Sequence, residues 1–76
     1  MGASPKHKYY ARLAFDKPVN GIGSFVSYSN DDLEMLIGTL RSEAKRFGVK
    51  CSAEIMMRYN GKLLTISKPK DEDLRV

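Results

Sequence analysis

Residues able to perform covalent or metal chemistry are scarce in this chain of 76 residues, which contains one histidine, His7, and one cysteine, Cys51. A structural zinc site normally takes four Cys or His ligands, so these two side chains cannot build one. No serine stands in a nucleophile-elbow context, and His7 is the single imidazole available as a general base. We therefore predict that the chain is not an enzyme unless a partner supplies the chemistry. We expect no catalytic residue, no metal, no cofactor and no small-molecule substrate.

Two further motifs that can carry chemistry have simpler explanations here. Residues 21–24, Gly-Ile-Gly-Ser, lead into a predicted strand, whereas a phosphate-binding loop opens a helix. The carboxylates of Asp31 and Asp32 suit the first turn of a helix, and those of residues 71–73 suit a solvated tail. Cys51 is interpreted as a small core residue within a strand, and a chain with a single cysteine fits a reducing cytoplasm.

The stretch from Tyr28 to Val49 predicts an amphipathic helix around which the chain is organised. Counted from Leu33, its apolar residues recur at offsets of three, four, seven, eleven and fourteen, which places them on one stripe of a helix. Ser29 is expected to cap the first turn, with Asp32 completing a capping box, and Gly48 is expected to end the helix in the left-handed conformation. The stripe consists of Leu33, Leu36, Ile37, Leu40, Ala44 and Phe47.

Alternation of apolar and polar residues predicts a hairpin before this helix. Residues 7–15 alternate as a half-buried strand. Residues 16–21 contain a proline and an Asn-Gly pair, which mark a turn or short loop. A second strand is predicted for residues 22–28, with Tyr28 facing inward and Phe25 facing outward.

A second hairpin is predicted after the helix, from two alternating segments, residues 49–59 and 62–68, on either side of Asn60-Gly61. Asn-Gly is the strongest short-range signal for a type I′ turn, because both central residues of that turn need positive φ. Cross-strand partners lie on the same face of a sheet, so inward residues should meet inward ones. The expected pairs are Tyr59 with Lys62, Met57 with Leu64, and Ile55 with Ile66.

Together these elements predict an α+β fold of order ββαββ, in which two antiparallel hairpins form one sheet and the helix packs on one face. We expect residues 1–6 to be a disordered arm, residues 7–69 a single domain, and residues 70–76 a solvated tail. No apolar run approaches the ~18 residues of a membrane span, and the N-terminus lacks the apolar core of a signal peptide. A cytoplasmic protein is therefore expected.

The sheet face turned away from the helix is the candidate binding site, because it mixes aromatic, aliphatic and basic groups where an ordinary solvent face would be polar. Bases of single-stranded nucleic acid stack on such rings, and cations meet the phosphates. An apolar patch with a charged rim is equally typical of a protein-binding surface or a homodimer interface. In a third interpretation, a terminal arm or the tail covers Phe25, Met56 and Leu63. The candidate residues are Lys8, Tyr10, Arg12, Phe25, Lys50, Met56, Arg58 and Leu63, with Thr65 beside them.

We therefore expect a small non-enzymatic binding module that binds nucleic acid through this open face. The formal charge of +4 permits such binding without requiring it. The alternative is a protein-interaction module that uses the same patch, either as a small inhibitor or adaptor that docks on a larger protein or as a homodimer. Nucleic-acid binding should weaken steeply with salt, whereas an apolar protein interface should depend little on it. No membrane partner is expected.

Overall fold

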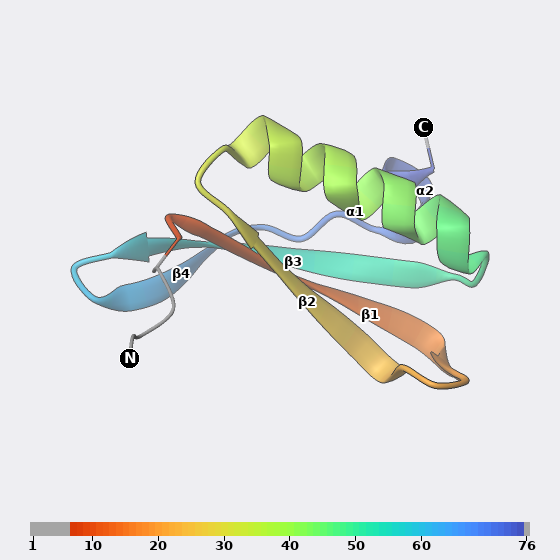
Figure 1. The fold of residues 1–76 in the computed structure, drawn as a ribbon. Coiled ribbons are helices and arrows are strands. Elements are labelled where there is room, and N and C mark those ends of the chain that lie inside the picture. The colour runs from red at the N-terminus through yellow and green to blue at the C-terminus, as the bar shows by residue number, and fades with distance from the viewer. Residues whose placement is uncertain (1–6, 76) are drawn as a thin grey trace.

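Four strands form one sheet in the computed structural model, which describes residues 7–75, and two helices lie on the same side of that sheet (Figure 1). The strand order is β2-β1-β3-β4, and every neighbouring pair is antiparallel. The predicted ββαββ order and the helix on one face of a single sheet are confirmed. The elements are β1 (Tyr9–Val19), β2 (Gly23–Asn30), α1 (Leu33–Phe47), β3 (Cys51–Tyr59), β4 (Lys62–Ser67) and α2 (Asp71–Leu74).

The two hairpins join through their first strands, β1 and β3, which occupy the centre of the sheet. Because β2 and β3 are both antiparallel to β1, they run parallel to each other, and α1 crosses over β1 to connect them (Figure 1). This arrangement leaves β2 and β4 as the edge strands. The face opposite the helices, which we call the open face, therefore runs across all four strands.

The core lies between the helices and the sheet, and the predicted stripe of α1 faces it. Leu36, Leu40 and Ala44 are buried, and Phe47 packs edge-to-face on Phe15 with ring centres 5.0 Å apart. This burial orients α1 because only one of its faces is apolar. The buried core residues are Ala11, Leu13, Phe15, Leu36, Leu40, Ala44, Cys51, Ala53, Ile55 and Leu74.

The helix begins later than the sequence predicts. Ser29 belongs to β2 and pairs with Tyr10, so it does not cap the helix. Asp32 is the N-cap, and its side chain accepts a hydrogen bond from the backbone N–H of Met35 at 3.2 Å. Ser29 and Asp32 both have side chains that can cap a helix. Because the pairing of β2 with β1 extends to Asn30, Ser29 stays in the strand and Asp32 is the cap. The predicted end is confirmed, since Gly48 takes a left-handed φ of 66°.

The first strand is longer than predicted, because the chain remains extended through Val19 instead of turning after Phe15. The pairing with β2 shifts between Ala14 and Val19, so the extra residues form an irregular end of the hairpin. The turn itself is tight and uses Gly21 at a φ of 85°. The Asn-Gly pair was therefore the true turn signal, and Pro18 lies within the end of β1.

The second hairpin has the predicted turn, with Asn60 at a φ of 51° and Gly61 at 75°. The pairs Tyr59–Lys62 and Met57–Leu64 are confirmed. The predicted pair of Ile55 with Ile66 is wrong, because the register shifts beyond Met56 and Ser67 lies opposite Ile55. An extra residue in one strand is a β-bulge, which alternation alone does not reveal.

The predicted solvated tail, residues 70–76, is wrong for the part that the structure describes. Residues 71–74 form α2, which packs on β3 and α1, and Leu74 is only 1% exposed. The side chain of Asp71 also accepts a hydrogen bond from the backbone N–H of Cys51 at 3.0 Å. The buried Leu74 side chain and the Asp71 carboxylate thus dock an otherwise charged segment against the core and β3. The predicted disordered arm, residues 1–6, lies outside the described residues.

Candidate functional site

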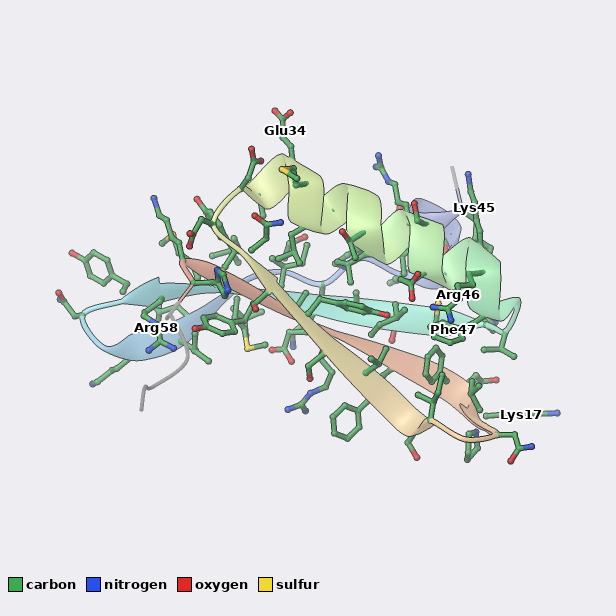
Figure 2. The ribbon with its side chains drawn as sticks, in the orientation of Figure 1. Lys17, Glu34, Lys45, Arg46, Phe47 and Arg58 are labelled. Carbon is green, nitrogen blue, oxygen red and sulfur yellow. The ribbon has the colours of Figure 1, made fainter. Side chains whose placement is uncertain are left out.

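The open face gathers six of the eight candidate residues, which come from all four strands. Alternation along the strands places them there, since the residues that alternate with them in the central strands, Ala11, Leu13 and Ile55, point to the helix side and are buried in the core. Figure 2 shows Arg58 on the side of the sheet away from α1, whereas Glu34 and Lys45 lie on the outer surface of the helix. The six residues are Tyr10, Arg12, Phe25, Met56, Arg58 and Leu63.

The other two candidates, Lys8 and Lys50, are not part of this group. The backbone of Lys8 continues the ladder, because its carbonyl accepts a hydrogen bond from the Arg58 N–H at 2.8 Å. Its ammonium, however, lies 5.5 Å from the centre of the Tyr9 ring, which packs against the core on the helix side. Lys50 precedes β3 and lines a different hollow at the far end of that strand.

Two arginines stack on aromatic rings across the open face. The guanidinium carbon of Arg12 lies 4.8 Å from the centre of the Phe25 ring, and that of Arg58 lies 5.0 Å from the centre of the Tyr10 ring. A guanidinium is attracted to the negative face of a ring at such distances. The Nη2 group of Arg58 also donates a hydrogen bond to the Tyr10 hydroxyl at 3.0 Å. Both cations are therefore held over rings and oriented by them.

The register of the sheet explains these stacks. Tyr10 lies directly opposite Met56, so Arg58 is its diagonal neighbour on β3. Phe25 lies opposite Ala14, so Arg12 is its diagonal neighbour on β1. Diagonal side chains on one face are within reach of each other when they are long or aromatic. The two stacks therefore depend on the order β2-β1-β3, which places their strands side by side.

The open face combines exposed apolar groups with an excess of positive charge. Phe25 is 49% exposed and Leu63 45%, while Arg12 is also exposed. The carboxylate that the sheet places among these groups, Glu54, accepts a hydrogen bond from the Thr65 hydroxyl. Cations, rings and aliphatic side chains are thus presented together on one surface.

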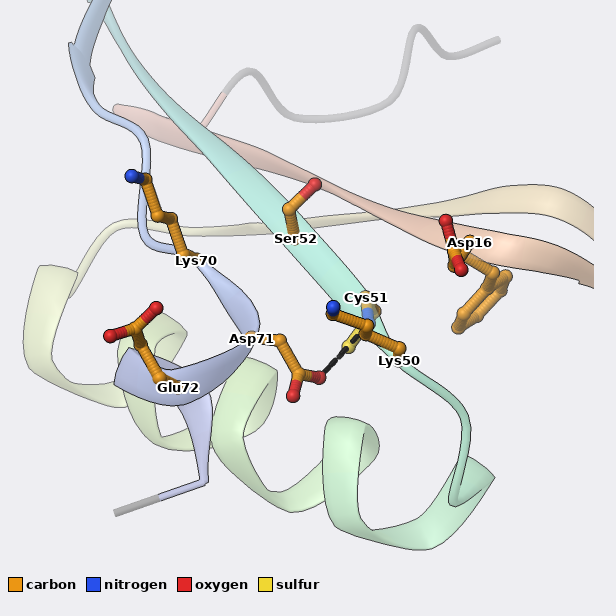
Figure 3. Close-up of a pocket in the computed structure, with 8 residues that line it drawn as sticks. Asp16, Lys50, Cys51, Ser52, Lys70, Asp71 and Glu72 are labelled. Atoms are coloured by element: carbon orange, nitrogen blue, oxygen red, sulfur yellow. Dashed lines mark hydrogen bonds between the residues drawn. The ribbon is translucent and has the colours of Figure 1, made fainter.

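The hollow that Lys50 lines has a volume of about 430 Å³ and lies at the N-terminal end of β3. It contains charges of both signs (Figure 3). Hydrogen bonds from the Cys51 N–H and the Arg75 side chain hold the pKa of Asp71 below its usual range. Burial, followed by the nearby Asp71 charge, raises the pKa of the Cys51 thiol. The thiolate is the reactive form of cysteine, so this thiol is a poor nucleophile. The interpretation of Cys51 as a core residue is confirmed, since it is 4% exposed.

His7 and Cys51 lie at opposite ends of the sheet. Cys51 pairs with Phe15, whereas His7 stands two residues before Tyr9, where β1 begins. At about 3.4 Å per residue, the stretch of β1 from Tyr9 to Phe15 alone spans roughly 20 Å, so the two side chains share no site. Within residues 7–75, no three His, Cys, Asp or Glu side chains are grouped to hold a metal ion.

Sequence reasoning missed two lysines that border the open face. Lys68 and Lys70 flank Pro69 just beyond β4 and line a hollow together with Arg12. The available signal was the Lys-Pro-Lys run, in which two cations follow a strand directly. From the sequence we predict only that the strand ends at residue 68 and that a tail begins at residue 70.

Comparisons with protein-family models, with curated proteins and with solved structures find no match to this chain. In residues 7–75, neither helix has the length and apolar character needed to cross a membrane.

Proposed function

We propose that this chain is a small non-enzymatic module that binds single-stranded nucleic acid through the open face. The observation that carries the proposal is the pair of stacks, Arg12 on Phe25 and Arg58 on Tyr10, which lie on the three adjacent strands β2, β1 and β3. The cytoplasm is the proposed location, because Cys51 is a free cysteine and reducing compartments keep thiols unpaired.

Rings and guanidinium planes are the two kinds of surface on which unpaired bases stack. Phe25 offers an exposed ring, and Arg12 and Arg58 offer cationic planes that their own rings hold in place. Because every base has an aromatic face, such stacking tolerates different sequences and contributes about 1–3 kcal/mol per base. We therefore propose that the open face binds single strands of many sequences and does not select one sequence.

The proposal is tested by fluorescence anisotropy with a labelled single-stranded oligonucleotide, titrated at several salt concentrations. Phe25→Ala should weaken binding by about 1–3 kcal/mol, while Phe25→Leu, which retains apolar bulk without the ring, should restore little of the loss. Arg58→Ala should weaken binding and also flatten the salt dependence if Arg58 meets a phosphate.

The control is a double substitution on the outer surface of α1, Arg41→Ala with Lys45→Ala, which removes two exposed cations far from the open face. This variant should bind almost as well as the parent. If it loses binding while the open-face variants do not, the helix is the binding surface and the proposal is wrong. Tyr10→Phe keeps the ring but removes the hydroxyl, which accepts hydrogen bonds from the His7 N–H and from Arg58 Nη2, each at 3.0 Å, so it should weaken binding less than Tyr10→Ala, which also removes the ring.

The edge strand β4 favours a second candidate function, association with another copy of this chain. All six residues of β4 are exposed, and Leu63, Leu64 and Ile66 each remain 44–45% exposed. The helices do not extend over this strand, since α1 packs on β1 and β2, and α2 packs on β3 and α1. An apolar edge strand is a template for further strand pairing.

The symmetry of a sheet determines how two copies would pair. A two-fold axis perpendicular to the sheet keeps the same face of both copies on the same side. Such an axis must lie midway between the two copies of one residue, which then pairs with its own counterpart. With the axis at Leu64, the two Leu64 side chains meet on the helix side, and Leu63 of each copy lies opposite Thr65 of the other. In this register Lys62 lies opposite Ile66 of the other copy. Like charges directly opposite each other would destabilise the pair, and this register avoids them.

Sedimentation velocity over a range of protein concentrations tests this second candidate. A concentration-dependent dimer should form, and Leu64→Glu should abolish it by placing two carboxylates against each other. Met35→Glu, at a residue of α1 that is 62% exposed, is the matched control and should leave the dimer intact. A protein that sediments as a monomer throughout would refute this candidate.

A further inference from the structure

A hollow of about 450 Å³ lies on the open face beside Arg12. It forms where β3 extends past the end of β4 and the chain continues toward α2, with the Pro69 carbonyl accepting a hydrogen bond from the Ala53 N–H at 2.9 Å. Ala14 and Ser52 are paired on the neighbouring strands and both line the hollow. Because these side chains are small, they leave the space above the sheet unfilled.

Positive charge dominates the walls of this hollow. Arg12 comes from β1, and Lys68 and Lys70 come from the segment that follows β4. None of the ion pairs found within residues 7–75 involves these three cations. The one carboxylate in the lining, Glu54, is engaged by the hydroxyl of Thr65. The charges of the lining groups therefore suit an anion with several acceptor oxygens.

Arg12 connects this hollow to the exposed ring of the open face. Its guanidinium lies over Phe25 and its side chain also lines the hollow. Phe25 pairs with Ala14, and Ala14 pairs in turn with Ser52, so the ring and the floor of the hollow follow one another across β2, β1 and β3. Neighbouring strands lie about 4.8 Å apart, which places Phe25 and Ser52 roughly 10 Å from each other.

We propose that this hollow is a phosphate-binding subsite for single-stranded nucleic acid, an inference that rests on the function proposed above. A base stacks on the surface formed by Phe25 and Arg12. The backbone phosphate next to that base enters the hollow, where Arg12, Lys68 and Lys70 surround it. Guanidinium and ammonium groups both donate charge-assisted hydrogen bonds to phosphate oxygens.

The test measures the affinity for a labelled single-stranded oligonucleotide as a function of salt. For single strands, the logarithm of the binding constant falls with the logarithm of salt by about 0.7 per phosphate contact. Lys68→Ala combined with Lys70→Ala should therefore reduce this slope by about 0.7, and weaken binding most strongly at low salt. The double variant Arg41→Ala, Lys45→Ala carries the same change in charge and should leave the slope unchanged.

A second pair of variants tests the hollow without removing a cation. Ser52→Glu places a carboxylate on the floor of the hollow at an exposed position and should lower affinity at least tenfold. Ser42→Glu adds the same charge at an exposed position of α1 and should change affinity less than twofold. Circular dichroism of both variants checks that the fold is retained.

The outcomes separate this inference from the proposed function. If the parent binds, Phe25→Ala weakens binding and the lysine pair lowers the slope, the subsite is supported. If Phe25→Ala weakens binding but the lysine pair and Ser52→Glu behave like their controls, the subsite is wrong and the stacking surface remains. If the parent binds no single strand at any salt concentration, both the proposed function and the subsite are refuted.

Discussion

Replacing Leu74 with alanine should reveal how firmly the C-terminal segment belongs to the core. Leu74 is 1% exposed and anchors α2, a helix of four residues, against β3 and α1. The substitution removes three carbon atoms from a buried side chain. At about 0.8 kcal/mol per buried methylene, the lost burial corresponds to about 2.4 kcal/mol.

The position of α2 at the end of the chain limits this cost. Truncating a buried leucine within α1 leaves a cavity that the neighbouring turns of the helix keep open. The short helix α2 can instead shift or undock, which reduces the cavity left by Leu74→Ala. We therefore expect a loss of about 2 kcal/mol in the free energy of unfolding. For a domain of this size, that loss lowers the melting temperature by roughly 10 °C.

Urea unfolding followed by circular dichroism measures the loss, with Glu72→Ala as the exposed control on the same helical turn. The control should stay within about 0.5 kcal/mol of the parent, as surface substitutions usually do. If Leu74→Ala undocks α2 from the native state, the slope of free energy against urea should also fall, because less surface remains to be exposed on unfolding. A loss no larger than that of the control would refute the docking of α2.

Three further predictions concern the core, the second hairpin and the response to pH. Leu40→Ala should cost about 2–5 kcal/mol in urea unfolding, and equal losses from Met35→Ala, at a residue 62% exposed, would contradict the assignment of the helical stripe. Gly61→Val should lower the melting temperature, since its φ of 75° costs about 1–2 kcal/mol for a residue with a side chain, and an unchanged value would show that the turn is misplaced. Burial, reinforced by the nearby Glu43, raises the pKa of Tyr28 from 10.0 to about 12. The stability that depends on its proton should therefore be complete below pH 10.0 and lost as the pH rises toward about 12, a loss that Tyr28→Phe should reduce. Absorbance titration checks the assignment, and a phenol of Tyr28 that ionises at the ordinary value would contradict it.

The parts of the fold that follow from local chemistry could be predicted from the sequence. Asn60-Gly61 specifies its turn because both residues must take positive φ, and both do. Gly48 ends α1 for the same kind of reason. The bulge at Ile66 could not be predicted, because an inserted residue leaves the alternation on either side intact. Leu74 was missed because one apolar residue among charged ones shows no periodicity.

The candidate site was predicted less completely than the fold. Alternation correctly assigned Arg12 and Phe25 to the same face, but alternation does not say which strands are neighbours. The contact between these two side chains depends on β1 lying beside β2 in a particular register. Lys50 was assigned to the face by the same alternation, yet it lies beyond the end of β3. Faces can thus be predicted from the sequence, whereas the grouping of residues within a face requires the strand order.

The most direct test of the central claim is a titration of the isotopically labelled protein with a single-stranded oligonucleotide, followed amide by amide by NMR. Binding through the open face should shift the signals of Arg12, Phe25 and Arg58 and of their neighbours in the central strands. Signals from the outer surface of α1, such as those of Arg41 and Lys45, should remain unchanged. Shifts confined to α1, or no shifts at any oligonucleotide concentration, would contradict the claim.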